Sequence, residues 1–206
     1  MHGSIKFLVS LCLLLLTHSV SFGQVLPDQP AKRKTKVHTL FDSSKNRTTA
    51  IIGPFELWKP PHNPVSGDLN FEELSLIVSF SYPDKKVVTP KTVELAIDSS
   101  SHGRELFKKH RQLVLELDSQ HFAWGEMELI GSNSHYVQTR VSPPLTGAQV
   151  FYERLKKEIS LEQFLLIANS KKAQMKLGGR KYPLNKDHLE AFRNFVLLMR
   201  QEGLEF

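Results

Sequence analysis

The sequence predicts an α+β fold: a mostly antiparallel β-sandwich-like domain followed by a helix, a β-hairpin and a helix at the C-terminus. Two observations predict it. Between residues 48 and 142, short segments of alternating polar and apolar residues are separated by turn residues, which is typical of antiparallel strands. After residue 160, apolar residues recur at helical spacing in two segments that flank a glycine pair.

The clearest strand is the segment LSLIVSFSY (74–82), where apolar residues occupy one face and serines the other. The segments 92–100 and 112–119 alternate in the same way, and TAIIGPFELW (49–58) is an earlier strand that Gly53–Pro54 interrupts. Six or seven short strands in succession favour an antiparallel sheet or sandwich.

The segment HFAWGEMELIG (121–131) changes phase in its middle, because Phe122 and Trp124 alternate out of step with the apolar residues that follow. A one-residue slip at Gly125–Glu126 restores the pattern, so we predict a β-bulge there. The segment GSNSH (131–135) lies where a hairpin turn is expected, and SHYVQTRVS (134–142) is predicted to be the return strand.

Two helices are predicted near the C-terminus. Ser160 and Gln163 form a capping box for a helix that continues to about Asn169, and Asn185 caps a second helix from about 186 to 202. The segment 151–159, whose apolar residues recur every fourth position, fits either a strand or a helix, and we favour a strand because a new helix starts directly after it.

The segment MKLGGRKYPLN (175–185) resembles a phosphate-binding loop only in its glycine pair and adjacent cations. It lacks both the G-x-G-x-x-G and the G-x-x-x-x-G-K-[ST] spacing. A two-residue hairpin turn explains it better, because Gly-Gly tolerates positive φ and the turn sorts the flanking residues into one apolar and one polar face. In that register Lys176 faces Lys181 and Leu177 faces Arg180.

The N-terminal residues predict export. Residues 1–23 read as a cleavable signal peptide with the apolar run Val9–Val20, so the mature protein is expected to be secreted or periplasmic. Cys12 is the only cysteine, which leaves the mature chain without disulfides or a thiol nucleophile. Residues 24–47, with six Lys and Arg against two Asp, predict a flexible basic linker, and residues 48–206 a single globular domain. Asn46 begins an N-glycosylation motif, which matters only in a host that glycosylates exported proteins.

The cations near the glycine pair form the candidate binding site, an anion-facing hairpin with Lys172, Lys176, Arg180 and Lys181. Facing lysines repel one another, and a bound anion would relieve that repulsion. The simpler alternative is that the long side chains extend into water. The expected partner is an anionic envelope polymer or a protein. Nucleic acid is not expected, and membrane contact is at most peripheral, through the basic linker.

Catalysis has little support in the sequence. No H-x-H or H-E-x-x-H motif is present, so neither a metal nor another cofactor is expected. Glu126 and Glu128 are the carboxylates named for acid–base work on a sugar, since residues two apart on a strand share a face. Trp58 is expected in the core or at a sheet edge, with ligand stacking as the alternative. The acids Asp68, Glu72 and Glu73 are expected to solvate their loop.

The leading functional hypothesis is therefore an exported, non-catalytic binding or scaffolding domain of the cell envelope. The alternative is a secreted hydrolase that acts on a polysaccharide.

Overall fold

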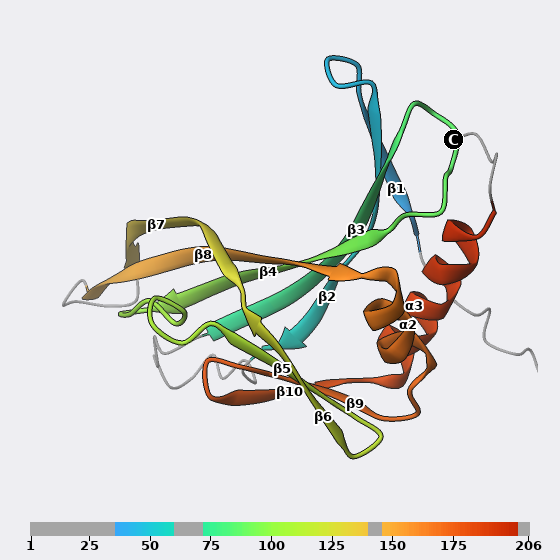
Figure 1. The fold of residues 1–206 in the computed structure, drawn as a ribbon. Coiled ribbons are helices and arrows are strands. Elements are labelled where there is room, and N and C mark those ends of the chain that lie inside the picture. Colours follow the sequence, from blue (N-terminus) through green and yellow to red (C-terminus); the bar gives the residue numbers. More distant parts are fainter. Residues whose placement is uncertain (1–35, 60–71, 140–145, 202–206) are drawn as a thin grey trace, which may run out of the picture. The chain divides into compact units, whose positions relative to one another are not determined.

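The computed structural model describes residues 36–59, 72–139 and 146–201. They form a mostly antiparallel β fold with two helices (Figure 1). The signal peptide, the first half of the predicted linker (residues 24–35) and Asp68 lie outside the described residues. No helix in the described part of the chain is long and apolar enough to cross a membrane.

Six antiparallel strands form the larger sheet, in the order β1-β2-β3-β4-β8-β7. Its strands are β1 (His38–Asp42), β2 (Arg47–Trp58), β3 (Glu72–Pro83), β4 (Thr92–His102), β8 (Thr146–Ser160) and β7 (Glu128–Thr139). The segment 151–159 belongs to β8, so the strand prediction for it is confirmed. The alternation of β3 is also confirmed, because every second residue from Leu74 to Tyr82 is buried and the serines are half-buried on the other face.

Four strands form the smaller sheet, in the order β10-β9-β5-β6. They are β10 (Arg180–Leu184), β9 (Ala173–Leu177), β5 (Gln112–Leu117) and β6 (Gln120–Glu126). Strands β9 and β10 pair in the predicted register around Gly178 and Gly179, with Lys176 opposite Lys181. Both glycines have positive φ, which is why this turn needs residues without a Cβ.

The helices are α2 (Leu161–Asn169) and α3 (Lys186–Met199). Ser160 and Gln163 form the predicted capping box of α2, and Asn185 accepts the N–H of His188 at the start of α3. The side chain of Arg193 in α3 donates to the carbonyl oxygens of Ala168 and Ser170 at 2.8 and 3.0 Å, so α3 also satisfies the C-terminal end of α2.

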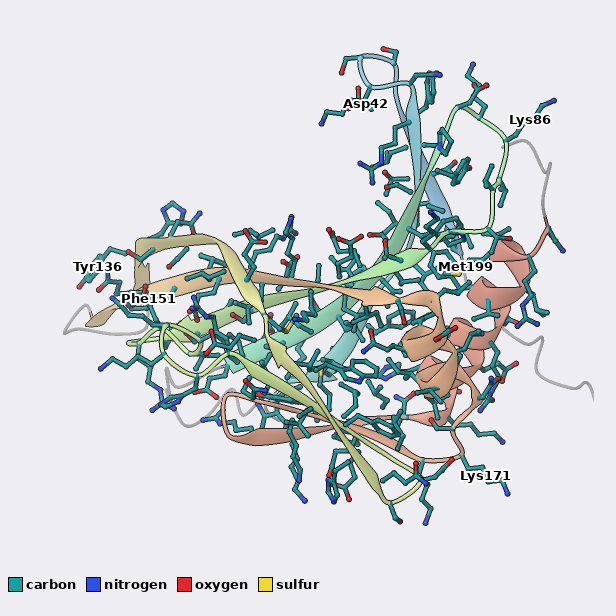
Figure 2. The ribbon with its side chains drawn as sticks, in the orientation of Figure 1. Asp42, Lys86, Tyr136, Phe151, Lys171 and Met199 are labelled. Carbon is teal, nitrogen blue, oxygen red and sulfur yellow. The ribbon has the colours of Figure 1, made fainter. Side chains whose placement is uncertain are left out.

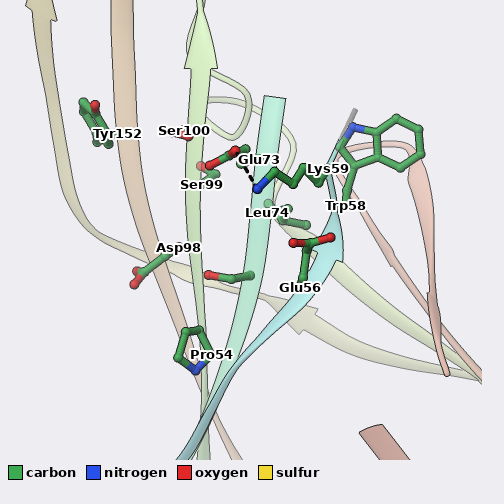
Figure 3. A pocket seen from close by; sticks show the side chains of 11 residues that line it. Pro54, Glu56, Trp58, Lys59, Glu73, Leu74, Asp98, Ser99, Ser100 and Tyr152 are labelled. Carbon is green, nitrogen blue, oxygen red and sulfur yellow. Dashed lines mark ion pairs between the residues drawn. The ribbon is translucent and has the colours of Figure 1, made fainter. Parts of the chain in front are cut away.

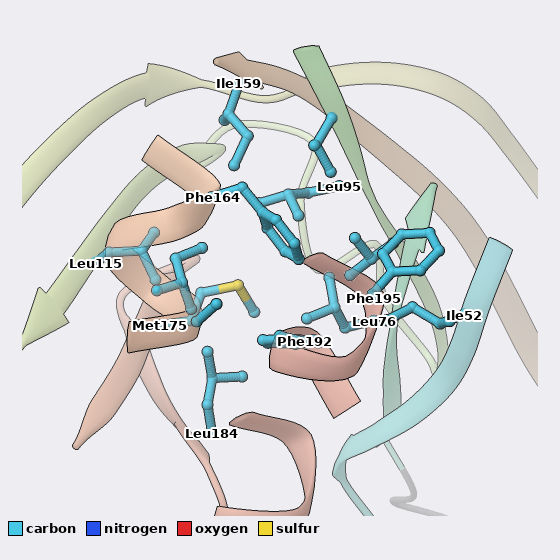
Figure 4. Close-up of a cluster of buried hydrophobic side chains, with 14 of the residues drawn as sticks. Ile52, Leu76, Leu95, Leu115, Ile159, Phe164, Met175, Leu184, Phe192 and Phe195 are labelled. Atoms are coloured by element: carbon cyan, nitrogen blue, oxygen red, sulfur yellow. The ribbon is translucent and has the colours of Figure 1, made fainter. Parts of the chain in front are cut away.

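The inner faces of both sheets and the two helices share one hydrophobic cluster. Side chains fill the space between the sheets (Figure 2), and Figure 4 shows Phe164, Phe192 and Phe195 beside aliphatic residues from both sheets. The ring centroids of Phe164 and Phe192 lie 5.6 Å apart, and those of Phe80 and Phe195 lie 5.0 Å apart. Both contacts are tilted: the first joins α2 to α3, the second joins α3 to β3 of the larger sheet, and together they favour a single core.

The prediction of a hairpin at GSNSH (131–135) is wrong. Strand β7 runs without a turn from Glu128 through these residues to Thr139 and pairs with β8. The chain instead changes sheet at Met127, whose side chain is 1% exposed and whose N–H donates to the carbonyl of Arg111. A strand that moves from one sheet to another keeps its alternation, so the sequence pattern does not reveal the change.

The predicted bulge is confirmed, one residue earlier than expected. Leu113 pairs with Gly125 and Val114 with Ala123, which leaves Trp124 as the extra residue. Gly125, which follows the extra residue, has a φ of 82°, a conformation that favours glycine.

Strand β1 falls within the stretch predicted to be a flexible linker, so the ordered part of the chain begins before residue 48. All five of its side chains are exposed, and it is held by its pairing with residues 47–51 of β2. The composition of residues 24–47 did not indicate this strand, because an exposed strand can be held by backbone hydrogen bonds to its neighbour without any apolar pattern of its own.

Candidate functional site

The outer face of the six-stranded sheet carries a row of polar side chains that cross four strands. Glu56 of β2 pairs with Ser75 of β3, which pairs with Asp98 of β4, which pairs with Arg154 of β8. Because successive strand residues point to opposite faces, the same strands send their apolar residues into the core. The alternation that builds the core therefore also builds this polar face.

A hollow of about 390 Å³ lies on this face. Figure 3 shows it from close by. Strand β2 and the residue after it contribute Pro54, Glu56, Trp58 and Lys59, and the neighbouring strands contribute Glu73, Leu74, Ser75, Asp98, Ser99, Ser100 and Tyr152. The floor is therefore a mixture of hydroxyls, carboxylates and one ammonium, with Leu74 beneath it.

Two exposed aromatic residues flank the hollow. Trp58 is 46% exposed and Tyr152 is 44% exposed, and Figure 3 shows them on opposite sides with the other labelled residues between them. His135 of β7 packs against the Tyr152 ring with 5.9 Å between ring centroids. Strands β3 and β4 separate β2 from β8, so about 14 Å separates the two flanks at the usual strand spacing.

Trp58 lies at the end of β2, beyond the residues of β2 that pair with β1. Among the described strands it is therefore at the edge of the sheet, which is one of the two positions predicted for it. Its exposure is what the ligand-stacking alternative required.

Ion pairs organise most of the charges of the hollow. Lys59 Nζ lies 3.7 Å from Glu73 Oε1. Arg154 donates two hydrogen bonds of 2.5 Å to the two carboxylate oxygens of Asp98, and this bonding raises the pKa of Arg154. The hollow's lining then holds three carboxylates, Glu56, Glu73 and Asp98, against the single cation Lys59, so acids are in excess.

The predicted anion-facing hairpin has an internal carboxylate where the external anion was expected. Glu116 of β5 lies 3.4 Å from Lys176 Nζ and 4.0 Å from Lys181 Nζ, and His121 Nδ1 lies 3.9 Å from the same oxygen. No local pattern in the sequence places β5 beside β9, so this partner was not foreseen.

The other two cations of the predicted site lie apart from that pair. Arg180 pairs with Glu72 at the start of β3, and Arg104 donates to the same carboxylate at 3.1 Å. Glu72 therefore joins the tip of the hairpin to the larger sheet and does not merely solvate a loop. Lys172 contacts Asp118 through its backbone: its carbonyl accepts the N–H of Asp118 at 3.0 Å, and its own N–H donates to the Asp118 carboxylate at 2.9 Å. That bond is the main cause of the lowered pKa of the Asp118 carboxyl, followed by the N–H of Lys171.

The prediction that Glu126 and Glu128 share a strand face is wrong, because Glu126 ends β6 in one sheet and Glu128 begins β7 in the other. Their side chains are 65% and 68% exposed and lie near Arg111 and Lys156, respectively. His121 of β6 and His135 of β7 also lie on different sheets, so these two histidines do not face one another across a hairpin. Among the described residues, no group of three or more His, Cys, Asp or Glu could hold a metal ion.

A buried carboxylate that the sequence analysis missed lies on the inner face of the larger sheet. Glu153 of β8 is 3% exposed and accepts the backbone N–H groups of Leu106 and Phe107. Its position in the alternation of β8, two residues before the buried Leu155, was obscured because the segment also fitted a helix.

The described residues therefore form a hollowed polar surface that two aromatic residues flank. They also form a hairpin whose cations Lys176, Lys181 and Arg180 are paired with carboxylates of the protein itself. The chain matches no family model, no curated protein and no solved structure, so these features of its own carry the functional argument.

Proposed function

We propose that the protein is an exported, non-catalytic binding domain of the cell envelope that takes its ligand in the hollow on the outer face of the six-stranded sheet. One observation carries this proposal: two exposed aromatic residues, Trp58 and Tyr152, flank a concave floor of hydrogen-bonding groups. Ligand sites are typically concave, with aromatic surface for affinity and a few polar groups for orientation. Large aromatic side chains that are exposed to water occur more often at partner-binding surfaces than elsewhere on a protein.

The signal-peptide pattern of residues 1–23 supports export, and the short basic stretch after it would tether the domain. In the proposed sandwich-like arrangement, the smaller sheet and the C-terminal helix, hairpin and helix cover the inner face of the larger sheet. That arrangement leaves the outer face available to an envelope component.

Binding is favoured over hydrolysis for a specific reason. A glycosidase needs a general acid that stays protonated at neutral pH, which burial or a neighbouring like charge provides. In the hollow, Asp98 is held by Arg154 and Glu73 is paired with Lys59. The glutamates originally named for that chemistry, Glu126 and Glu128, lie on different sheets. The polysaccharide-hydrolase alternative thus lacks a carboxylate pair in a suitable setting.

The hairpin is a weaker candidate for the ligand surface. Glu116 already supplies negative charge to Lys176 and Lys181, so an external anion would compete with it. The hollow is therefore the preferred binding surface, ahead of the hairpin cations Lys172, Lys176, Arg180 and Lys181.

Retention of the purified domain on native envelope fragments tests the proposal. The double variant Trp58→Ala/Tyr152→Ala should lose most of the retention that the wild-type protein shows. Phe41→Ala is the matched control, because Phe41 is an equally exposed aromatic, at 43%, on β1 away from the lining of the hollow. Undiminished retention of the double variant would refute the proposal.

A further inference from the structure

The side chains of the hollow discriminate between classes of envelope ligand. Building on the proposed function, we infer that the ligand is an uncharged polysaccharide chain that lies across the strands from Trp58 to Tyr152. The hollow combines two exposed aromatic rings, several hydroxyl and carboxylate groups, and an excess of acids over cations.

The aromatic rings and the polar floor together suit a saccharide. A sugar ring presents an apolar C–H face, which packs against an aromatic ring, and a rim of hydroxyls, which both donate and accept hydrogen bonds. The floor offers matching groups: the hydroxyls of Ser75 and Ser100 exchange hydrogen bonds in both directions, Glu56 accepts them and Lys59 donates them. An apolar ligand would leave these groups unpaired, at a cost in affinity.

The charge of the hollow argues against an anionic chain. Glu56, Glu73 and Asp98 line it against Lys59 alone. The nearby cation Arg154 is already bonded to both oxygens of Asp98. Because Lys59 is paired with Glu73 and Arg154 with Asp98, the lining offers no free cation to a chain that carries carboxylates or phosphates, and the carboxylate of Glu56 would repel such a chain.

The spacing of the flanks sets a length for the ligand. Three inter-strand spacings, about 14 Å in total, separate β2 from β8. A single sugar can touch only one aromatic flank, whereas a chain of about three rings, by the same spacing, reaches both. Affinity should therefore rise steeply once an oligosaccharide is long enough to reach Tyr152 from Trp58.

Affinity electrophoresis on a panel of polysaccharides tests the inference. The neutral members are glucan, mannan, xylan and a soluble polymer of N-acetylglucosamine, and polygalacturonate is the anionic counterpart. We expect at least one neutral polymer to retard the protein and polygalacturonate not to do so. Trp58→Ala and Tyr152→Ala should each weaken binding to that neutral polymer about tenfold, and Phe41→Ala should not. Retardation by a neutral chain should change less than about twofold between low and high salt, since screening acts on charges.

Opposite results would overturn the inference. It is wrong if no neutral polymer retards the protein, or if polygalacturonate binds more strongly and releases the protein at high salt. Loss of envelope retention in the Trp58→Ala/Tyr152→Ala variant, without binding to any neutral polymer, would leave the proposed function standing and remove only the saccharide. Undiminished envelope retention in that variant would remove both. The thermal unfolding midpoint of each variant, compared with wild type, confirms that a loss of binding is not a loss of fold.

Discussion

The carboxylate of Glu153 accepts the backbone N–H of Phe107, at 3.0 Å from one oxygen and 3.2 Å from the other. The N–H of Leu106 reaches the same carboxylate at 2.6 Å. Glu153 lies on the inner face of β8, and Phe107 is 1% exposed in the segment between β4 and β5. A buried carboxylate is tolerated only where donors meet it, and here the donors are main-chain groups that an irregular segment would otherwise leave unsatisfied.

Glu153→Ala should therefore lower the free energy of unfolding by about 2–4 kcal/mol, because two N–H groups lose their acceptor inside the protein. The free energy of unfolding of Glu153→Gln should lie between those of Glu153→Ala and wild type, because the amide oxygen can still accept a hydrogen bond. Chemical denaturation measures both. Glu128→Ala is the control, because Glu128 is an exposed glutamate of the same sheet at 68% exposure, and its loss should change stability little. Equal losses for Glu153→Ala and Glu128→Ala would show that the buried acceptor contributes nothing.

Gly178 and Gly179 provide a matched pair for the hairpin turn. Both have positive φ, 60° and 78°, so an alanine strains the backbone at either position by about 1 kcal/mol. A Cβ on Gly178 would also lie 2.9 Å from Cε1 of Phe107, whereas one on Gly179 would meet nothing within 4 Å. Gly178→Ala should thus destabilise the protein by about 1–3 kcal/mol more than Gly179→Ala, because the buried Phe107 ring must move. Thermal or chemical unfolding of the two variants compares them directly, and indistinguishable midpoints would contradict the contact.

Local patterns in the sequence predicted the local structure well. The register of β9 and β10, the capping box at Ser160 and the strand that contains residues 151–159 all depend on neighbours within a few residues. The switch of sheets at Met127 could not be predicted in the same way. A strand on either sheet shows the same alternation, and only the partners of β6 and β7 differ.

The candidate sites depended still more on long-range pairing. Lys176 and Lys181 were correctly placed opposite one another, but Glu116 comes from β5, far away in the sequence. The hollow likewise collects residues from β2, β3, β4 and β8, whose order in the sheet no local pattern encodes. The sequence could identify Trp58 as a notable residue, but not the Tyr152 that faces it across the sheet.

The position of Glu116 predicts how the hairpin responds to loss of that carboxylate. Glu116→Gln removes the negative charge that lies 3.4 Å from Lys176 and 4.0 Å from Lys181. The two ammonium groups would then face one another with only neutral groups between them, so retention on a sulfonated or heparin column should increase. Glu128→Gln, which removes one negative charge from an exposed position in β7, is the control for net charge. If both variants shift elution by the same amount, the increase reflects net charge alone and the hairpin has no latent anion site.

His188 should make the stability of the protein depend on pH. Its ring is 7% exposed, packs against Phe55 with 5.3 Å between ring centroids, and accepts the N–H of Asn185 through Nδ1. Burial lowers the pKa of His188, and the nearby Asp187 only partly opposes this effect. The unfolded chain, with an ordinary histidine pKa of about 6.5, therefore takes up the proton first as the pH falls. The stability that the neutral ring contributes is fully present above about pH 6.5, the pKa of the unfolded chain. It is lost as the pH falls from there toward the lower pKa of the folded protein.

His188→Gln should flatten this pH dependence, because glutamine at the third helical position can also accept the N–H of Asn185 and does not titrate. The thermal unfolding midpoint, measured from about pH 7 to about pH 5, should fall less in the variant than in wild type. The pKa of His102 is also lowered by burial, so the variant should retain part of the dependence. His110→Gln replaces an exposed histidine and should reproduce the wild-type profile. A His188→Gln profile parallel to that of wild type would mean that the buried ring takes up its proton as readily in the folded protein as in the unfolded chain.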